Sequence, residues 1–246
     1  MMAINYTSPG IKKAKNSAIT LCTLSILPFL ITGASIAPEN RVQRNDPYAN
    51  GFEIIFNGKN IDKWTSNTTE YVVEDGAIVF HPKIKKTGAG YLYTKKEYSD
   101  FIFRFEFQLT PGANNGLGIR VPLTDNAAYE GMELQILDNE AEMYRDLKTY
   151  QYHGSVYGVI PAKRGFLKQV GEWNVEEVIA KGPIIQVILN GTMIINGDIS
   201  EARKNGTMDK LPHPGLMRDK GHIGFVGHGS EVKFRNIRVK DLNTRR

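Results

Sequence analysis

The sequence predicts an all-β domain, an antiparallel two-sheet sandwich or jelly roll. From Gly51 onward, short apolar or alternating runs are separated by Gly, Asn, Asp and Pro at fairly regular spacing, which is typical of these folds. In the run FIFRFEFQL, Phe101 to Leu109, every second residue is Phe until the last, so one face of a strand is apolar. No Gly/Pro-rich linker divides the region, and a single domain over residues 51–243 is expected.

The other elements follow in chain order. Residues 71–80 predict a hairpin around Glu74-Asp75-Gly76, and the Asn190-Gly191 pair predicts a second tight hairpin between residues 184–189 and 193–195. A helix of one or two turns is expected near residues 200–204. Further strands are predicted over residues 117–121, 132–137, 222–226 and 231–239.

The N-terminal 37 residues have the pattern of a secretory signal peptide. Lys12, Lys13 and Lys15 precede an apolar run from Ala18 to Ile31 that is short for a membrane span, and small residues follow it. The polar residues 38–50 are expected to form a linker. The sequence therefore predicts a periplasmic or secreted protein with no stable membrane insertion after signal removal.

Composition excludes several classes of function. Of 31 basic side chains, three lie in the signal segment, which leaves 28 against 26 acidic ones, a net charge of +2 that gives no support for nucleic-acid binding. The single cysteine, Cys22, lies in the apolar run, so the mature protein has no disulfide or thiol chemistry. Phosphate-binding loops, HExxH and CxxC motifs and a GxSxG elbow are all missing from the sequence.

The stretch YEGMELQILDN holds the first candidate site residues. Glu133 and Gln135 are two apart on a predicted strand, so their side chains share a face about 6–7 Å apart. They form either the wet face of an ordinary antiparallel sheet or the floor of a groove. Asp138 lies just past the strand end, and Arg120 and Asn115 belong to the preceding strand region.

Other candidates lie farther along the chain. Tyr152 and His153 belong to the polar aromatic cluster Tyr150-Gln-Tyr-His-Gly154, and His228 lies between two glycines. Each has a structural alternative: Trp173 as a core or capping residue, His153 as a lone histidine, and the glycines beside His228 as points of close backbone packing.

Taken in order, these motifs resemble the 3-keto-disaccharide hydrolase domain family over nearly the whole mature chain. The resemblance is carried by residues 56–64, 73–78, 98–101, 114–120, 129–139, 171–174, 189–191, 221–229 and 234–238. It implies a concanavalin/laminarinase-like jelly roll with a sugar-binding groove on the concave sheet. Many family members have Gln and Asp before the C-terminal His-Gly, where this chain has Val226 and Gly227.

The resemblance also implies a reaction: cleavage of the glycosidic bond of 3-keto-glycosides by deprotonation at carbon 2. Such a reaction needs a base, an electrophile near the enolate oxygen and an acid for the leaving group. Glu133 is predicted as base, Arg120 as electrophile and His153 as acid/base. The residues predicted to bind substrate are Gln135, Asp138, Tyr152, Asn115, Trp173 and His228.

Two other functions fit the same fold. One is a non-catalytic carbohydrate-binding module or envelope lectin, and the other is a retaining glycosidase, which needs two carboxylates about 5–5.5 Å apart. No cofactor is defined by the sequence. Glu133, Asp138 and His153 are candidate ligands for a divalent cation, although their spacing does not establish a metal site. Oligomeric state is left open.

Overall fold

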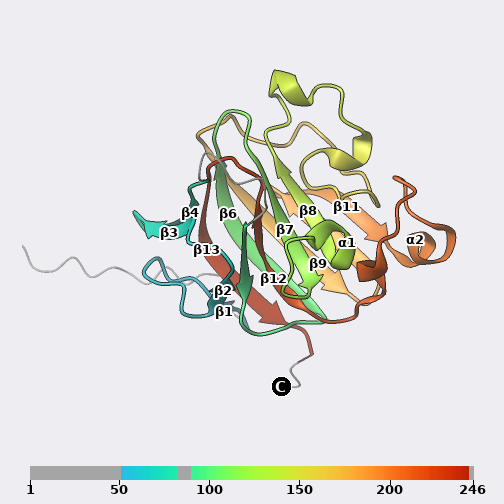
Figure 1. The fold of residues 1–246 in the computed structure, drawn as a ribbon, viewed down its shortest axis with the longest axis horizontal. Helices are drawn as coiled ribbons and strands as arrows, with labels where there is room; N and C mark the ends of the chain where they lie inside the picture. The colour runs from blue at the N-terminus through green and yellow to red at the C-terminus, as the bar shows by residue number, and fades with distance from the viewer. Residues whose placement is uncertain (1–50, 83–89, 244–246) are drawn as a thin grey trace, which may run out of the picture. The chain divides into compact units, whose positions relative to one another are not determined.

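The computed structural model describes residues 51–82 and 90–243, where two antiparallel sheets form a sandwich (Figure 1). The predicted fold class is therefore confirmed. In spatial order, one sheet contains β11 (Thr192–Asp198), β10 (Ile184–Leu189), β9 (Trp173–Lys181), β6 (Phe101–Leu109), β13 (Val232–Asp241), β4 (Ala77–Phe80) and β3 (Tyr71–Glu74), and β1 (Glu53–Ile54) also pairs with β13. The other contains β2 (Trp64–Ser66), β5 (Gly90–Thr94), β12 (His222–Gly227), β7 (Asn114–Val121) and β8 (Met132–Leu137).

Helices in the described ranges are short. They are α1 (Ala127–Glu130) and α2 (Ser200–Asn205), with single 3₁₀ turns η1 (Glu142–Tyr144), η2 (Thr149–Gln151) and η3 (Pro214–Met217). None of the described helices has the length and apolar character needed to cross a membrane. The predicted signal segment 1–37, with Cys22, and the linker 38–50 lie outside the described residues.

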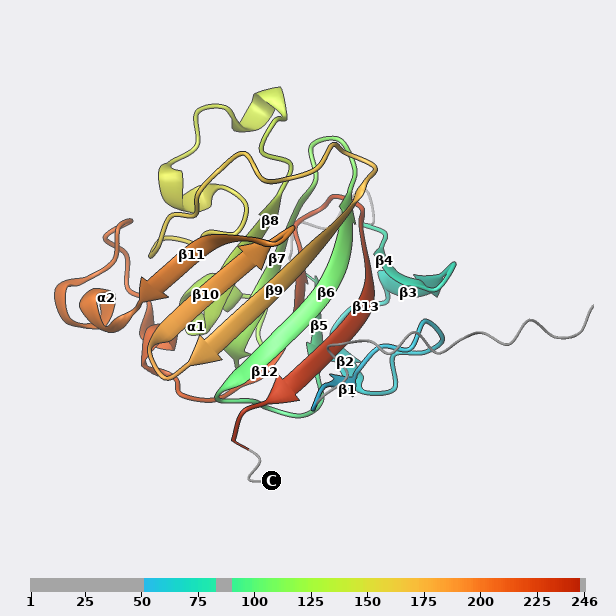
Figure 2. The same ribbon diagram turned by 180° about the vertical axis from the view of Figure 1, so that it is seen from behind.

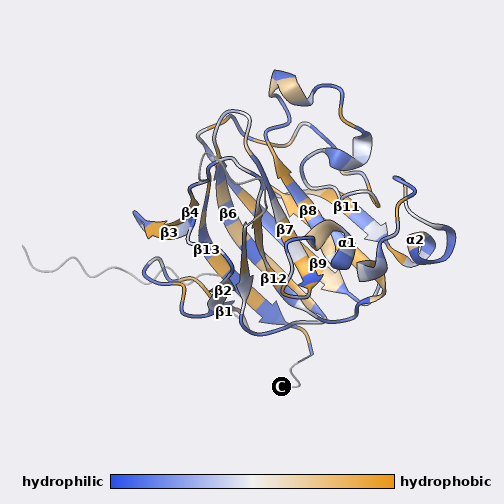
Figure 3. Cartoon of the chain, viewed as in Figure 1, coloured by the Kyte–Doolittle hydropathy of each residue, from blue (hydrophilic) through white to orange (hydrophobic). Residues whose placement is uncertain are grey.

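Aromatic side chains from both sheets fill the space between them. Along β6 the residues alternate between buried and half-buried, and the four Phe of this strand point into the core. Figure 3 shows hydrophobic and hydrophilic residues mixed along the strands of the sandwich. Phe225 of β12 stacks on Phe234 of β13 at a centroid distance of 3.7 Å. Since β12 and β13 belong to different sheets, this contact joins the two layers.

Three predicted strands, β6, β8 and β10, have the expected bounds, whereas β1, β2, β5 and β9 were missing from the prediction. In β9, seen on the eight-stranded face in Figure 2, the inward positions include Asn174 and Glu176. These polar residues interrupt the apolar alternation by which a strand is recognised from sequence.

A second, smaller apolar cluster lies on the other face of the five-stranded sheet. It consists of Tyr93, Val121 and Val226 from three strands together with Ala127 of α1. Through this cluster, α1 packs on the sheet beside β7 and β8 (Figure 1). The outer face of the sheet is thus partly covered, and a cavity opens beside α1 and β8.

Candidate active site

Glu133 and Gln135 of β8 point away from the sandwich core, because the alternate residues Leu134 and Ile136 belong to it. The two polar side chains are nevertheless only 5% and 6% exposed. An ordinary solvent-facing strand would leave them open to water. The prediction of a groove floor is therefore favoured over that of a wet sheet face.

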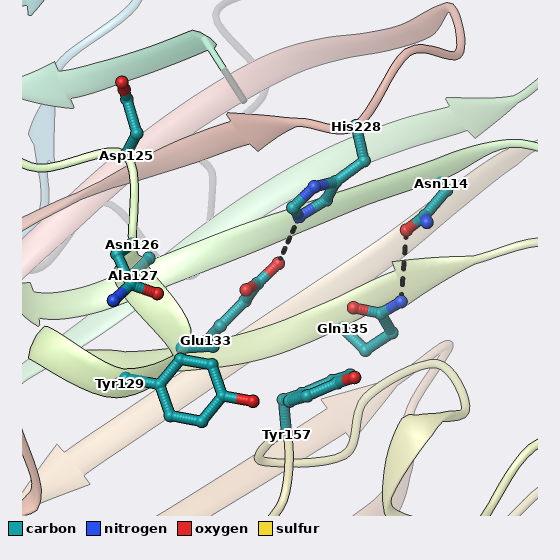
Figure 4. A pocket seen from close by; sticks show the side chains of 10 residues that line it. Asn114, Asp125, Asn126, Ala127, Tyr129, Glu133, Gln135, Tyr157 and His228 are labelled. Carbon is teal, nitrogen blue, oxygen red and sulfur yellow. Dashed lines mark hydrogen bonds and ion pairs between the residues drawn. The ribbon is translucent and has the colours of Figure 1, made fainter. Parts of the chain in front are cut away.

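A cavity of about 270 Å³ opens over these side chains. Figure 4 shows His228 and Asn114 on one side of Glu133 and Gln135, and Tyr129 and Tyr157 on the other. Ten residues line it: Asn114, Asp125, Asn126, Ala127, Ala128, Tyr129, Glu133, Gln135, Tyr157 and His228. The volume is near the lower end of ordinary ligand sites, and the lining is rich in polar groups that can bond to hydroxyls.

The closest charged contact in this cavity joins Glu133 and His228. The Oε1 of Glu133 lies 2.8 Å from the Nε2 of His228, which follows β12 directly. Burial lowers the pKa of His228, but the hydrogen bond and the negative charge of Glu133 outweigh it, and the pKa lies above its ordinary value. The pair therefore holds a proton that it can deliver to a ligand.

Gly116 makes room for the Glu133 carboxylate. It lies opposite Gln135 on the neighbouring strand β7, and a Cβ at this position would be 1.9 Å from the Oε1 of Glu133. Because β7 carries no side chain here, the carboxylate can lie across the strand and reach His228. Gly118, opposite Glu133 itself, is the second residue of this strand without a side chain on the cavity face.

Residues 154–157 run antiparallel to β8 and place Tyr157 beside Glu133. The amide of Tyr157 donates to the carbonyl of Glu133 at 2.9 Å, and the amide of Gln135 donates to the carbonyl of Ser155 at 3.0 Å. The phenol oxygen of Tyr157 accepts a hydrogen bond from the Nε2 of Gln151 at 2.9 Å. Its own hydroxyl hydrogen is therefore available to a ligand.

Arg120 lies elsewhere, and it is not among the residues that line the cavity with Glu133. Its Nε donates to the Ser99 carbonyl at 2.9 Å and its Nη1 to the Gly182 carbonyl at 2.8 Å, with Asp100 as ion-pair partner. The backbone at Arg120 has φ 51°, and the pairing of β7 with β12 shifts register beside it. This bulge redirects the side chain that simple alternation places over the sheet.

His153 is also turned away from the cavity. Its side chain is 1% exposed and lies 3.0 Å from the carboxylate of Glu176, without hydrogen-bond alignment, inside the sandwich. The ring packs 5.1 Å from that of Phe107, and its Nδ1 accepts from the Leu137 amide at 3.4 Å. The structure thus brings neither His153 nor Arg120 to Glu133.

Four other predicted residues have local structural partners. Asp138 accepts hydrogen bonds from the amides of Gly112 and Glu140. Asn115 is fully buried and accepts from the Gly116 amide. The Tyr152 hydroxyl donates to the Arg145 carbonyl, and the Trp173 ring lies under the guanidinium of Arg235 on the eight-stranded sheet. Of the predicted site residues, the cavity unites Glu133, Gln135 and His228.

The three candidate metal ligands do not converge. Glu133 pairs with His228, Asp138 caps a turn, and His153 faces Glu176. Within residues 51–82 and 90–243, no group of three or more His, Cys, Asp or Glu side chains is arranged to hold a metal ion. The donor set expected from the sequence therefore does not fit a divalent cation.

Comparison with known proteins identifies the family. Residues 51–240 match the model of the 3-keto-alpha-glucoside-1,2-lyase-like domain. The chain belongs to this family. A 3-keto-disaccharide hydrolase of Bacteroides thetaiotaomicron is 27% identical over 235 residues, which cover 79% of this chain and 80% of that protein.

Solved structures agree with this assignment. A protein of Parabacteroides distasonis described as a "putative glycosyl hydrolase" superposes with a TM-score of 0.68 at 30% identity, over 78% of this chain and 99% of that one. A second from the same organism gives 0.66 at 24% identity, over 79% and 95%, and supports the fold alone. Family membership and the relatives' names support a carbohydrate hydrolase-like function.

In this lyase-like domain, the cavity is also lined by residues that were not predicted from the sequence. Tyr129, Tyr157 and Asp125 line the cavity. For Tyr157 a signal existed, since Ser155-Val156-Tyr157 alternates polar and apolar positions as an edge strand does. Val226 belongs to the apolar cluster under α1, and a Cβ at Gly227 would lie 2.1 Å from the Phe80 ring.

Proposed function

We propose that this chain is an exported enzyme that cleaves the glycosidic bond of 3-keto-glycosides, with Glu133 as base and His228 as acid. The observation that carries the proposal is the Glu133–His228 pair, 2.8 Å apart in a cavity lined by polar side chains. The names of the family and of the Bacteroides relative support the substrate class. The signal-like segment 1–37 supports a periplasmic or secreted location.

The first step removes the proton at carbon 2 of the sugar. The ketone at carbon 3 acidifies this proton, and the Glu133 carboxylate takes it as the enolate forms. The enolate then expels the glycosidic oxygen from carbon 1, and His228 protonates that oxygen as it leaves. This step yields an unsaturated ketone and the free alcohol, and no oxocarbenium ion is required.

Water completes the reaction. His228, now neutral, takes a proton from water as its oxygen adds to carbon 1, and Glu133 returns its proton to carbon 2. Both residues regain their starting states, and the sum is hydrolysis of the glycosidic bond. Acid–base groups used in this way typically contribute about 10²–10⁴-fold each.

Negative charge on the enolate oxygen needs hydrogen-bond donors in place of Arg120. The Tyr157 hydroxyl meets this need, because its oxygen already accepts from Gln151 and its hydrogen is directed by that bond. Gln135 donates one amide hydrogen to the Oδ1 of Asn114 at 3.1 Å and has a second to offer. These neutral donors replace the cation that the sequence predicted.

The test is a matched substrate panel. Purified protein is incubated with 3-keto-glucosides and with their unoxidised parents, with and without a chelator, and the released alcohol is measured. The proposal predicts release from the 3-keto-glucosides alone. Release from the parents at equal rates would instead favour a retaining glycosidase. Binding of unoxidised glycans without release would favour the binding-module alternative.

A further inference from the structure

A buried histidine–aspartate pair lies behind the cavity, in the segment of residues 206–217 that follows α2. The Nε2 of His213 lies 2.9 Å from the Oδ2 of Asp209, and its Nδ1 lies 3.0 Å from the carbonyl oxygen of Ala128 in α1. The side chains of His213 and Asp209 are only 1% and 7% exposed. Neither side chain lines the cavity or takes part in the proposed chemistry.

The two partners of His213 fix its protonation. A carbonyl oxygen only accepts hydrogen bonds, so the Nδ1 of His213 carries a hydrogen. Burial raises the pKa of Asp209, but hydrogen bonds from His213, Thr207 and the Leu211 amide outweigh it, and the pKa lies below its ordinary value. Asp209 is therefore an ionised acceptor, and the Nε2 of His213 carries a hydrogen as well. His213 is a charged bridge between two acceptors.

This bridge contacts the backbone next to both tyrosines of the cavity. Ala128 precedes Tyr129, whose ring also lies 4.7 Å from the His213 ring. The amide of Asp209 donates to the carbonyl of Gly158, the residue after Tyr157, at 3.2 Å. A Cβ at Gly158 would be 2.3 Å from the Oδ2 of Asp209, so the turn after Tyr157 packs directly on the carboxylate.

We infer that Asp209 and His213 are positioning residues that hold the Tyr129 and Tyr157 walls of the cavity at a fixed separation. α1 and the turn at Gly158 are short, and each contacts the same buried pair. A single charged pair therefore sets the placement of two side chains that face the substrate. The kinetic test of this inference rests on the proposed function, whereas the test by amide hydrogen exchange does not.

The test compares two substitutions at Asp209. The Asp209→Asn variant keeps the Oδ1 that accepts from Thr207 and Leu211 and places an amide hydrogen toward the Nε2 of a neutral His213, which still donates to Ala128. The Asp209→Ala variant removes the side-chain link to His213 and the carboxylate on which the Gly158 turn packs, and it keeps the backbone hydrogen bond to Gly158. On a 3-keto-glucoside, Asp209→Ala should lower kcat by up to about 10²-fold, the effect of a displacement near 1 Å, and Asp209→Asn should restore kcat to near the wild-type value.

Amide hydrogen exchange gives the second readout. Asp209→Ala should speed exchange in residues 127–131 and 156–160, and Asp209→Asn should not. The control is Glu74→Ala, which removes the exposed Glu74–His81 pair on the β3–β4 hairpin and should change neither readout. Equal kcat loss in both Asp209 variants, or unchanged exchange in Asp209→Ala, would overturn the inference. If wild-type protein cleaves no 3-keto-glucoside, the proposed function fails, and the exchange result alone decides the role of the pair.

Discussion

Two of the histidine–glutamate pairs in the described residues have nearly equal lengths but lie in very different environments. Glu133 and His228 are 2.8 Å apart, and the His228 side chain is 32% exposed at the cavity. His153 and Glu176 are 3.0 Å apart, and both side chains are sealed between the sheets. The same two residue types therefore face a cavity in one place and lie in the core in the other.

Access, more than identity, separates the two pairs. Proton transfer to a substrate requires a group within hydrogen-bond reach of it, which a side chain enclosed by the core cannot provide. Glu133 lies on the outer face of its sheet, where Gly116 leaves space for its carboxylate across β7, whereas Glu176 occupies an inward position of β9. The alternation of residues around each glutamate specifies only which face of its sheet the side chain occupies.

The strongest way to break this comparison is to neutralise the cavity glutamate. Glu133→Gln should lower kcat/KM on a 3-keto-glucoside by about 10²–10⁴-fold, because the amide cannot accept the carbon 2 proton. Thermal unfolding should change little, since the amide still fits beside His228. The control, Glu74→Gln, alters the exposed pair with His81 and should keep full activity. Cleavage at the wild-type rate by Glu133→Gln would remove Glu133 from the mechanism.

The core pair should show the opposite response. His153→Leu leaves the Glu176 carboxyl group, which is 0% exposed, without the polar side chain that lies 3.0 Å from it. Removing one member of a buried pair typically lowers the free energy of unfolding by about 3–5 kcal/mol. The activity of each folded molecule should remain. Urea unfolding measures the first effect, and kcat at a temperature well below the transition measures the second.

A double substitution sharpens that result. Replacing both members, as in His153→Leu with Glu176→Leu, removes the stranded carboxyl group and should recover much of the lost stability, as apolar replacements of buried pairs often do. Equal losses in the single and double variants would mean that volume, and not the polar pair, governs this part of the core.

Space around the cavity glutamate gives the next test. Gly116→Ala places a Cβ where the Oε1 of Glu133 now lies, so the carboxylate must move away from His228. We expect kcat to fall by about 10²-fold, as for other displacements near 1 Å. Gly118→Ala is the matched control two residues along the strand, because its nearest side-chain contacts are Val121, Tyr93 and Ala127. A larger kcat loss in Gly118→Ala than in Gly116→Ala would contradict this account.

Sequence reasoning predicted the fold and selected Glu133, Gln135 and His228, which line the cavity, but it did not predict the other side chains around them. The alternation of β6 and β8 is local, so it specified both strands and placed Glu133 and Gln135 on one face. Arg120 was misplaced because a bulge with positive φ redirects it. A bulge depends on strand pairing between distant segments, which local periodicity does not reveal.

The histidine beside Glu133 is His228 and not the predicted His153, for a similar reason. His153 has a polar aromatic neighbourhood in sequence, but residues 154–157 pair with β8 so that Tyr157, and not His153, faces the cavity. His228 reaches Glu133 across 95 residues of chain. His228 was a candidate because of the family resemblance. Its contact with Glu133 depends on β12 lying beside β7.

The smallest expected effect is a change in titration at the cavity pair. In the wild type, Glu133 holds the pKa of His228 above the ordinary value of about 6.5. The stabilisation from this pair is present at lower pH and is lost as pH rises through the His228 pKa. The same loss of the proton should make kcat/KM fall on the alkaline side.

Glu133→Gln removes the carboxylate hydrogen bond and the negative charge that raise the pKa of His228, whereas the burial that lowers this pKa remains. His228 should therefore titrate at lower pH in this variant. Proton NMR of the five histidines measures this, with the other four as internal controls. If the His228 signal does not move, the charge of Glu133 does not control its proton, and the assignment of His228 as acid fails.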